Sequence, residues 1–291
     1  MPSERVSFSN RNGENLAGLL DRPAGEPRAW ALFAHCFTCS KNLKAATHLA
    51  GALNARGIAV LRFDFTGLGR SEGEFGDTSF SSNVDDLLAA VDFLAAEHSA
   101  PALLVGHSLG GTAVLAAADR VPSAVAVATI GSPADPAHVR HLFGDSIAEL
   151  ESEGVASVDL GGRSFRVRRQ MIDDLLTHDL KSDVAGLRKA LLILHAPLDD
   201  TVEIDNASAL FLAARHPKSF VSLDDADHLL SRPADSRYAG EVLAAWASRY
   251  LPGEEEEAVS ASADEAVAIT RAGSFTTRLT AAGHPLIADE P

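Results

Sequence analysis

Residues 101–118 read PALLVGHSLGGTAVLAAA, and this segment decides the fold. Its first part is a short apolar stretch that predicts a buried strand, and its last part has the small apolar residues of a buried helix. Between them, residues 106–110 form a G-x-S-x-G motif, which turns the chain sharply from strand to helix. The flanking glycines allow strand and helix to approach closely, so the hydroxyl of Ser108 projects above the sheet. This context predicts a nucleophilic serine, with the backbone N–H of Leu109 facing an oxyanion.

Short apolar segments alternate with helical segments along most of the chain. Continuous apolar strands separated by helices predict a mostly parallel sheet that is covered by helices on both faces. The first residues differ, because the sequence around Asn12-Gly13 predicts an antiparallel β-hairpin ahead of the parallel strands. The remaining strands are expected at residues 28–36, 57–65, 101–108, 123–133 and 189–197, and helices at 44–56, 81–98 and 109–120.

The composition is that of an ordinary globular protein, and it narrows the classes of partner. A formal net charge of −15 argues against nucleic acid and anionic membranes, because both carry charge of the same sign. No apolar run reaches the roughly 18 residues that a membrane helix needs. The polar first ten residues contain no secretory apolar core. With only two cysteines, we expect a cytoplasmic protein without a disulfide framework.

A serine nucleophile needs a base, and the base needs a carboxylate that orients it. The strand–turn–helix setting of Ser108 predicts the chain order serine, acid, histidine, with the last two on loops after later strands. The sequence LLILHAPLDDTV supplies Asp199 and Asp200 after one strand, and SFVSLDDADHLL supplies His228 after another. Both positions lie at strand ends, where open α/β sheets place their sites. Ser108, His228 and one of the two aspartates are therefore the predicted catalytic residues.

Over residues 1–252 the chain resembles the α/β-hydrolase superfamily. The family's acid motif, H-G-x-x-D-x-x-V, is similar to HAPLDDTV at residues 195–202, where Ala196 takes the place of the glycine. The family's D-x-x-G-x-G-x-S turn is similar to DFTGLGRS at residues 64–71, and we expect it to be a structural turn beside the site.

The resemblance implies an α/β-hydrolase fold with a Ser-His-Asp triad and no cofactor. The register of the acid motif makes Asp199 the triad acid and leaves Asp200 as a solvated or lid-contacting neighbour. In the family, the residue after an H-G pair at the end of the first parallel strand donates a backbone N–H to the oxyanion. The matching residues here are 35–37, so Phe37 and Leu109 are the implied oxyanion-hole residues.

The two cysteines, Cys36 and Cys39, belong to this loop and have the spacing C-x-x-C. Cys36 replaces the family's glycine, so we expect the loop to follow a somewhat different path. A redox pair is one alternative, because a following helix lowers the pKa of a thiol at its N-terminus. A two-cysteine metal site lacks further ligands. We expect the two sulfurs to serve packing.

Residues 135–188 interrupt the alternation of strands and helices, and we expect them to form a short lid. Helical stretches flank a hairpin around Gly161-Gly162. A surface excursion without function is the alternative. Apolar side chains of the lid offer an acyl-binding pocket, and packing of the lid on the core is their other expected role. These substrate-binding candidates are Leu142, Phe143, Phe165, Met171 and Leu175.

The last part of the chain differs in composition from the rest. Residues 253–266 form an acidic linker of small residues, and residues 267–291 alternate like a β-hairpin around Ala282-Gly283. This end is similar to the first hairpin of the OsmC-like domain in bifunctional α/β-hydrolase/OsmC-like proteins. The resemblance implies a truncated OsmC-like domain, whose complete form would make a homodimer and carry reactive thiols. A disordered tail is the alternative.

The histidines besides His228 are expected to serve structure. His107 adjoins the nucleophile but is expected to point away from it on the turn. His35 and His195 stand at strand ends, where hydrogen bonds that brace loops are the expected role. No histidine pair has a convincing metal spacing with a third ligand, so we predict no metal.

These residues predict a serine carboxylesterase that cleaves small-to-medium acyl esters through an acyl-enzyme. Ser108 would attack, His228 would transfer the proton, and Asp199 would orient His228. Amidase or thioesterase action would use the same triad. A non-catalytic binding module and a C-x-x-C redox protein are alternatives from other classes, and the complete triad argues against a pure binder. The expected partner is a small-molecule ester.

Overall fold

The computed structural model describes residues 3–36, 40–144, 146–160, 163–252, 266–270, 276–281 and 284–289. Its centre is an eight-stranded sheet with the strand order β1-β2-β4-β3-β5-β6-β9-β10. The six strands from β4 to β10 in this order run parallel to one another, and β2 joins β4 in the antiparallel sense. The strands are β1 (Glu4–Ser9), β2 (Asn15–Asp21), β3 (Ala29–Ala34), β4 (Ile58–Phe63), β5 (Leu103–His107), β6 (Ala126–Ile130), β9 (Ala190–His195) and β10 (Lys218–Ser222).

The N-terminal hairpin predicted around Asn12-Gly13 is confirmed. Strands β1 and β2 pair antiparallel, and Gly13 closes their turn with φ 83°, a backbone conformation that glycine adopts freely. The central strands are mostly apolar, and every residue of β3, β4, β5, β6 and β9 is buried. Such strands need cover on both faces of the sheet, which fixes the layered architecture.

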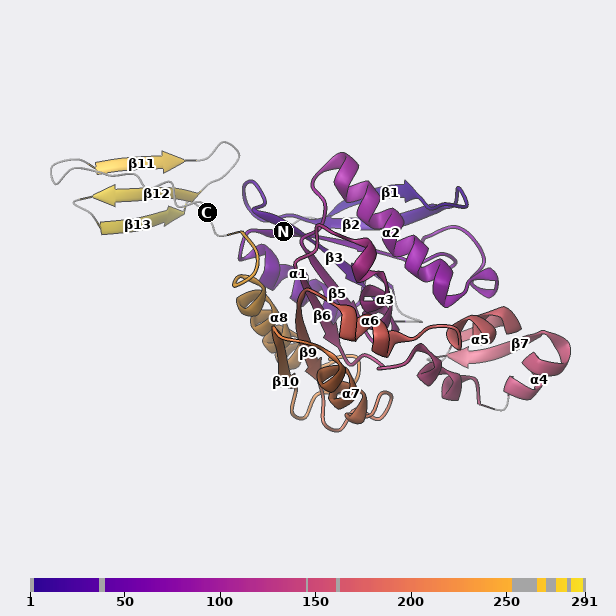
Figure 1. Ribbon diagram of the computed structural model, residues 1–291. Helices are drawn as coiled ribbons and strands as arrows, with labels where there is room; N and C mark the ends of the chain where they lie inside the picture. Colours follow the sequence, from indigo (N-terminus) through magenta and orange to yellow (C-terminus); the bar gives the residue numbers. More distant parts are fainter. Residues whose placement is uncertain are drawn as a thin grey trace.

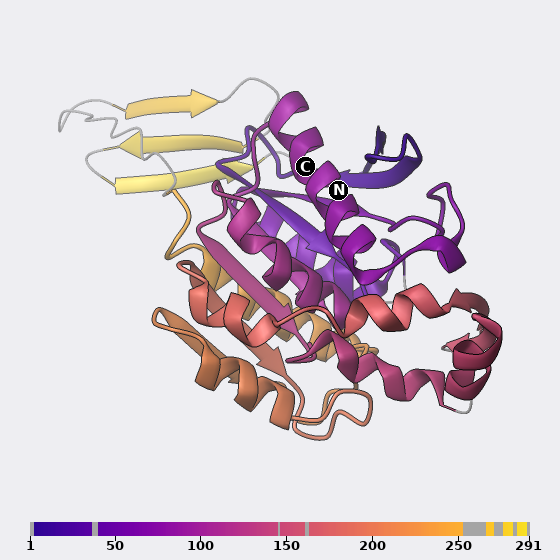
Figure 2. The ribbon, with the colours of Figure 1, turned by 45° about the vertical axis from the view of Figure 1, so that its right-hand side comes forward.

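Helices lie on both faces of the sheet (Figures 1 and 2). Two hydrophobic cores, one on each face, hold the layers together. Helices α1 (Lys44–Asn54) and α8 (Pro233–Ala247) pack against each other over one face. Helices α2 (Phe80–Glu97), α3 (Leu109–Ala117), α6 (Leu180–Gly186) and α7 (Asp205–Ala213) cover the other. Among the described residues, no helix combines the length and the apolar character needed to cross a bilayer.

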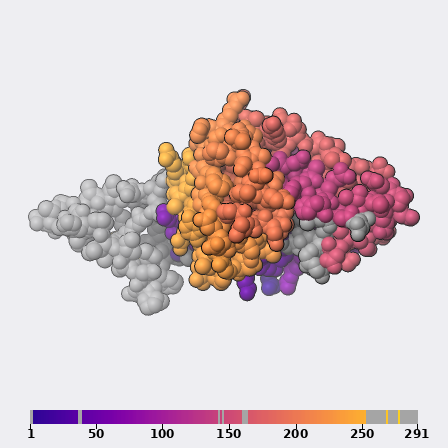
Figure 3. All heavy atoms as spheres, turned by 90° about the horizontal axis from the view of Figure 1, so that it is seen from below, coloured from indigo at the N-terminus to yellow at the C-terminus, as the bar shows by residue number. Residues whose placement is uncertain are grey.

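The predicted lid, residues 135–188, leaves the sheet after β6 and returns to it at β9. Its elements are η3 (Pro136–Phe143), α4 (Ser146–Glu153), β7 (Val155–Leu160), β8 (Arg163–Arg168), α5 (Arg169–Leu175) and the helix α6. Strands β7 and β8 form the antiparallel hairpin expected around residues 161–162, which themselves lie outside the described residues. In the space-filling view, the lid forms one side of the molecule beside the segment 190–250 (Figure 3).

The lid is fastened to the core through the short helix η1 (Phe75–Asp77) and the start of α2. Asp174 accepts hydrogen bonds from the backbone N–H of Ser81, at 2.6 Å, and from its hydroxyl, at 2.7 Å. Arg168 forms an ion pair with Asp77 at 2.7 Å. The rings of Phe75 and Phe165 lie 4.8 Å apart between their centroids. These contacts hold the base of the lid against the helical layer.

A second, three-stranded antiparallel sheet lies near the C-terminus, with the order β11-β12-β13. Strands β12 (Thr276–Ala281) and β13 (His284–Asp289) are the predicted hairpin. Strand β11 (Ala266–Thr270) is not among the strands predicted from the sequence, although its residues AVAIT suit a strand. The predicted linker, residues 253–266, lies outside the described residues except for Ala266.

Candidate active site

The site begins at the sharp turn between β5 and α3. Ser108 has φ 55° and ψ −129°, a strained conformation for a residue other than glycine. The backbone is held there by the N–H of Ser108, which donates to the carbonyl of Ile130 at 2.8 Å. A Cβ at Gly106 would collide with the backbone of Gly110, and a Cβ at Gly110 would collide with the carbonyl oxygen of His35. Both glycines are therefore needed for the turn that raises Ser108 above the sheet.

The structure brings the three predicted catalytic residues into one hydrogen-bonded line. The hydroxyl of Ser108 lies 3.0 Å from Nε2 of His228, and Nδ1 of His228 lies 2.8 Å from Oδ2 of Asp199. These distances let the histidine accept the hydroxyl proton while it donates its other ring N–H to the carboxylate. Ser108 is 8% exposed and Asp199 is 6% exposed, so the line is largely shielded from water.

Asp199 is tied down on both carboxylate oxygens. Its Oδ1 accepts the backbone N–H groups of Thr201 and Val202, each at 2.9 Å, and its Oδ2 accepts from His228. Burial alone would raise the pKa of Asp199, but the hydrogen bonds from His228 and the two backbone groups outweigh it and lower that pKa. The carboxylate thus stays charged and fixed. Asp200 is exposed, in keeping with its role as a neighbour.

The structure describes one of the two predicted oxyanion-hole residues, Leu109. Leu109 is the first residue of α3, so its backbone N–H has no acceptor inside the helix and is free to face a substrate oxygen. Phe37 lies outside the described residues, and its role stays a prediction. Beneath Leu109, a cavity of about 10 Å³ has room for a single water molecule at most.

Buried polar side chains hold the described residues on either side of residues 37–39. His35 donates from Nδ1 to the carbonyl of Cys36 at 2.7 Å. At the other end of the loop, the backbone N–H of Lys41 donates to Asp64 at 2.7 Å, and the Lys41 ammonium pairs with the same carboxylate. Asp64 also accepts the backbone N–H of Arg70 at 3.0 Å, so Asp64 joins the predicted turn at residues 64–71 to Lys41.

The expectation that the cysteines serve only packing is wrong for Cys36, which is disulfide-bonded. The sequence contains one other cysteine, Cys39, which lies outside the described residues. The C-x-x-C spacing is the sequence signal for such a bond.

Sequence reasoning missed a role for His107. Its Nε2 lies 2.7 Å from the backbone carbonyl oxygen of His228. The two imidazole rings are 5.1 Å apart between centroids. Burial, with a smaller contribution from His228, lowers the pKa of His107 to about 3. The bracing role predicted for His195 is confirmed, because its Nε2 donates to the carbonyl of Val202 at 2.7 Å.

The lid residues that were predicted to bind substrate are found in the packed interior of the lid. Phe143, Phe165, Met171 and Leu175 all belong to the larger hydrophobic core and are at most 8% exposed. The side chain of Leu142 lies outside the described residues. None of the four side chains that are described lines the lid cavity, so a substrate-binding role for them stays a prediction.

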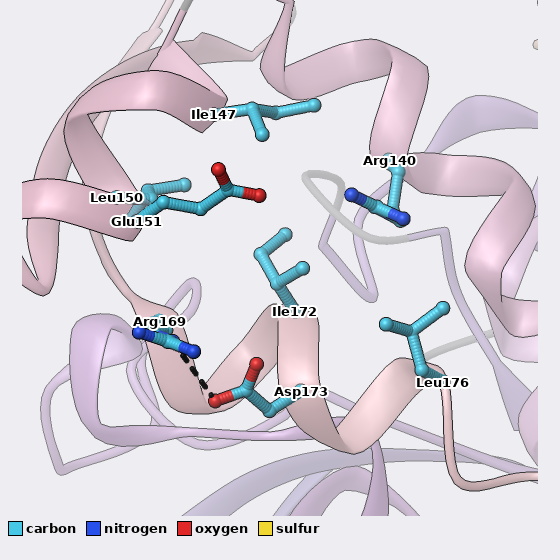
Figure 4. A pocket seen from close by; sticks show the side chains of 8 residues that line it. All are labelled: Arg140, Ile147, Leu150, Glu151, Arg169, Ile172, Asp173 and Leu176. Carbon is cyan, nitrogen blue, oxygen red and sulfur yellow. Dashed lines mark ion pairs between the residues drawn. The ribbon is translucent and has the colours of Figure 1, made fainter.

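The lid contains a cavity of about 310 Å³ between η3, α4 and α5 (Figure 4). Glu151 and Arg140 face each other across it, while Arg169 and Asp173 form an ion pair at 3.3 Å on its wall. The apolar lining residues are Ile147, Leu150, Ile172 and Leu176. A volume of this size suits a small organic group. Within the described part of the chain, no cluster of histidine, cysteine or acidic side chains is arranged to hold a metal ion.

This chain is similar in sequence and in fold to known proteins. Residues 25–158 match the family model described as serine aminopeptidase, S33. The crystal structure of the esterase domain from a Rhodothermus marinus protein is 54% identical, with a TM-score of 0.73. That similarity covers 87% of this chain and 100% of the esterase domain.

Two curated relatives extend the comparison. Human ABHD10, a mitochondrial palmitoyl-protein thioesterase, is 30% identical over 205 residues, which are 68% of this chain and 66% of that protein. The uncharacterized protein YfhR of Salmonella typhimurium is 29% identical over 235 residues, or 78% of this chain and 75% of that protein. The fold predicted from the sequence is confirmed by these similarities and by the sheet described above.

Proposed function

The chain belongs to the α/β-hydrolase superfamily and is a serine hydrolase by family, and from this premise we propose that it is a carboxylesterase acting on small-to-medium acyl esters. The observation that carries the proposal is the line from Ser108 through His228 to Asp199, with separations of 3.0 and 2.8 Å. A scaffold used only for binding has no need of a buried carboxylate, a base and a strained serine in one line.

The first half of the proposed reaction forms an acyl-enzyme. Oγ of Ser108 attacks the ester carbonyl carbon as Nε2 of His228 takes the hydroxyl proton. The negative charge that develops on the carbonyl oxygen is stabilised by the backbone N–H of Leu109 and, as implied by the family, by that of Phe37. The charged Asp199 stabilises the imidazolium, which then gives its proton to the departing alcohol.

The second half reverses the roles of the groups. A water molecule takes the place of the alcohol, and His228 removes one of its protons as the water attacks the acyl carbon. The same backbone donors stabilise the second tetrahedral intermediate. Collapse of this intermediate releases the carboxylic acid and returns the proton to Ser108, so no cofactor takes part.

Three observations bear on the class, the size and the charge of the substrate. The related Rhodothermus marinus domain is an esterase domain, and it matches this chain over its whole length. The lid is short and is fastened at its base, which favours a substrate of modest size. The net charge of −15 disfavours strongly anionic substrates.

A thioester is the second candidate substrate, because ABHD10, 30% identical over 205 residues, is a palmitoyl-protein thioesterase. The same serine, histidine and aspartate would attack a thioester carbonyl without any change of role. An ester and a thioester of the same acyl group differ only in the leaving atom, so a matched pair of substrates separates the two candidates.

The test is hydrolysis of p-nitrophenyl acetate, butyrate and octanoate, together with the matching acyl thioesters, by the wild type and by Ser108→Ala. We expect ester turnover that falls by more than about 10³-fold in the folded variant. A wild type that is folded yet inactive on every ester contradicts the carboxylesterase proposal. Turnover confined to the thioesters would move the thioesterase to first place.

For the C-terminal sheet, we propose that β11, β12 and β13 belong to an OsmC-like domain that follows a hydrolase domain at residues 1–252. The antiparallel sheet and the acidic composition of residues 253–266 support this division. The 87% of the chain that matches the esterase domain is consistent with it. Limited proteolysis tests the boundary: cleavage within residues 253–266 should leave a folded fragment of residues 1–252 that keeps the esterase activity, and a fragment that unfolds once residues 253–291 are removed would count against the division.

A further inference from the structure

We propose that His107 is a positioning residue for the catalytic base, holding the backbone of His228 at the place from which its ring reaches Ser108. The inference rests on the serine-hydrolase chemistry proposed above, because it assigns His107 a task only in relation to that triad. His107 touches neither the hydroxyl of Ser108 nor any reacting atom. It acts through His228.

The contact that carries the proposal links two distant parts of the chain. Nε2 of His107 lies 2.7 Å from the carbonyl oxygen of His228, and the two residues are 121 positions apart. His107 is the last residue of β5 and is directly followed by Ser108, so both groups leave the same strand end. The nucleophile is thus joined to this strand by the chain itself, and the base is joined to it by one hydrogen bond. A fixed strand end therefore sets the distance between them.

The loop that carries His228 needs such an anchor. It lies between β10 and α8 and contains two residues other than glycine with positive φ, Asp225 at 60° and Leu230 at 51°. Conformations of this kind persist only where surrounding contacts impose them. Several bonds of this loop are local, such as the one from the backbone N–H of Ser231 to Asp227 at 2.8 Å. The bond from His107 instead ties the middle of the loop to the sheet.

The protonation state of His107 fits this task. A carbonyl oxygen accepts only from a donor, so Nε2 carries the proton, while the buried Nδ1 has no hydrogen-bond partner among the described residues. The ring is therefore neutral, as its burial at 3% exposure favours. Neutrality matters because the rings of His107 and His228 are 5.1 Å apart. A cation at His107 would oppose the imidazolium that forms on His228 during catalysis.

The test compares two substitutions at this position with a matched control. His107→Met keeps an extended, buriable side chain but removes the donor, and His107→Gln keeps an N–H donor of similar reach. His48→Met is the control, since His48 bonds to Ser236 on the helix pair α1–α8. Each folded variant is titrated for active sites with a fluorophosphonate, and kcat and KM for p-nitrophenyl butyrate are then determined per active site.

For His107→Met, we expect kcat and the rate of fluorophosphonate labelling to fall about 10- to 100-fold, because small misplacements of a catalytic group are costly. KM should stay within about threefold, and His107→Gln should recover most of the lost rate. His48→Met should match the wild type.

Three results would overturn the inference: full kcat per active site in His107→Met, a loss equal in His107→Gln and His107→Met, or a change in KM alone. A merely structural role would lower the fraction of active sites and the melting temperature without changing the rate per site. Failure of the proposed function looks different, because the wild type itself would then react with neither ester nor fluorophosphonate.

Discussion

The burial of a neutral His107 should make the stability of this protein depend on pH in a way that one substitution removes. The pKa of His107 is lowered from 6.5 to about 3 in the folded chain, mainly by burial. Between these two values the unfolded chain binds a proton at this position and the folded chain does not. The free energy of unfolding therefore falls as the pH falls through this window, and it is unaffected well above pH 6.5.

The size of the effect follows from the two pKa values. When the pH falls from about 7.5 to about 5.5, His107 becomes protonated in the unfolded chain only. This protonation stabilises the unfolded chain by about 1.4 kcal/mol. Glutamine does not titrate, so His107→Gln should lose about 1.4 kcal/mol less than the wild type over the same interval. His35 and His195 also have pKa values lowered by burial, but their contributions are present in both proteins and cancel in the difference.

The assay is urea unfolding of both proteins at the two pH values, with the free energy taken from linear extrapolation. Any constant cost of the substitution drops out, because only the change with pH is compared. The exposed His141 provides the control, since His141→Gln alters a side chain that meets water before and after unfolding. Losses of free energy that agree within about 0.5 kcal/mol between wild type and His107→Gln would show that His107 is not buried in its neutral form.

Three further predictions concern the triad, the lid and the loop after β3. Asp199→Asn should lower kcat on p-nitrophenyl butyrate by about 10³- to 10⁴-fold, because Asp199 contacts the catalytic histidine. Asp200→Asn is the control and should stay near the wild type. Equal losses of kcat in the two variants would contradict the register of the acid motif. Asp174→Ala removes the carboxylate that fastens the lid to α2, so hydrogen exchange in residues 169–175 should quicken, and unchanged exchange would show that the clamp is not needed. Lys41→Met leaves the fully buried Asp64 without its cation and should cost about 3–5 kcal/mol in urea unfolding; a cost below about 1 kcal/mol would show that the backbone bonds of Asp64 suffice.

Much of the fold was predictable because its signals are local. The run of buried residues in each central strand, the glycines around Ser108 and the turn at Asn12-Gly13 each act on a few consecutive residues. The proximity of Asp199 and His228 was predictable for a different reason. Both follow strands of one parallel sheet, and the carboxyl ends of such strands meet at one edge.

What the sequence did not reveal depends on contacts between distant segments. The sequence shows that His107 adjoins Ser108, but it does not show which group the His107 ring contacts. That group is the carbonyl of His228, which lies 121 residues later in the chain. The lid gives a second example, because apolar residues such as Phe143 and Met171 suit a substrate pocket and a packed interior equally well. Only the packing of η3 against α5 decides between these two environments. The three strands near the C-terminus were undercounted because a five-residue strand carries little periodic signal.

Three histidines around the site share one arrangement, in which a neutral ring donates a hydrogen bond to a backbone carbonyl. This arrangement explains why these positions hold histidine and not another donor. His35, His107 and His195 each end or follow a strand, and each lies 2.7 Å from a backbone carbonyl of a loop beside the triad. Burial lowers the pKa of all three, so each ring donates a proton without carrying a charge. A lysine or arginine would place a cation in the protein interior at a cost of several kcal/mol or more. It would also add a positive charge close to the imidazolium that catalysis must form.

The neutral imidazole thus combines a rigid ring, a single directed donor and no charge. The loops around the triad must hold strained backbone in place. They must also add no second positive charge near the imidazolium of His228, which Asp199 stabilises. On this argument, exchanging any of the three histidines for lysine should harm the rate per active site more than exchange for glutamine, even where both variants fold. Equal rates for the lysine and glutamine variants at all three positions would show that the absence of charge is incidental.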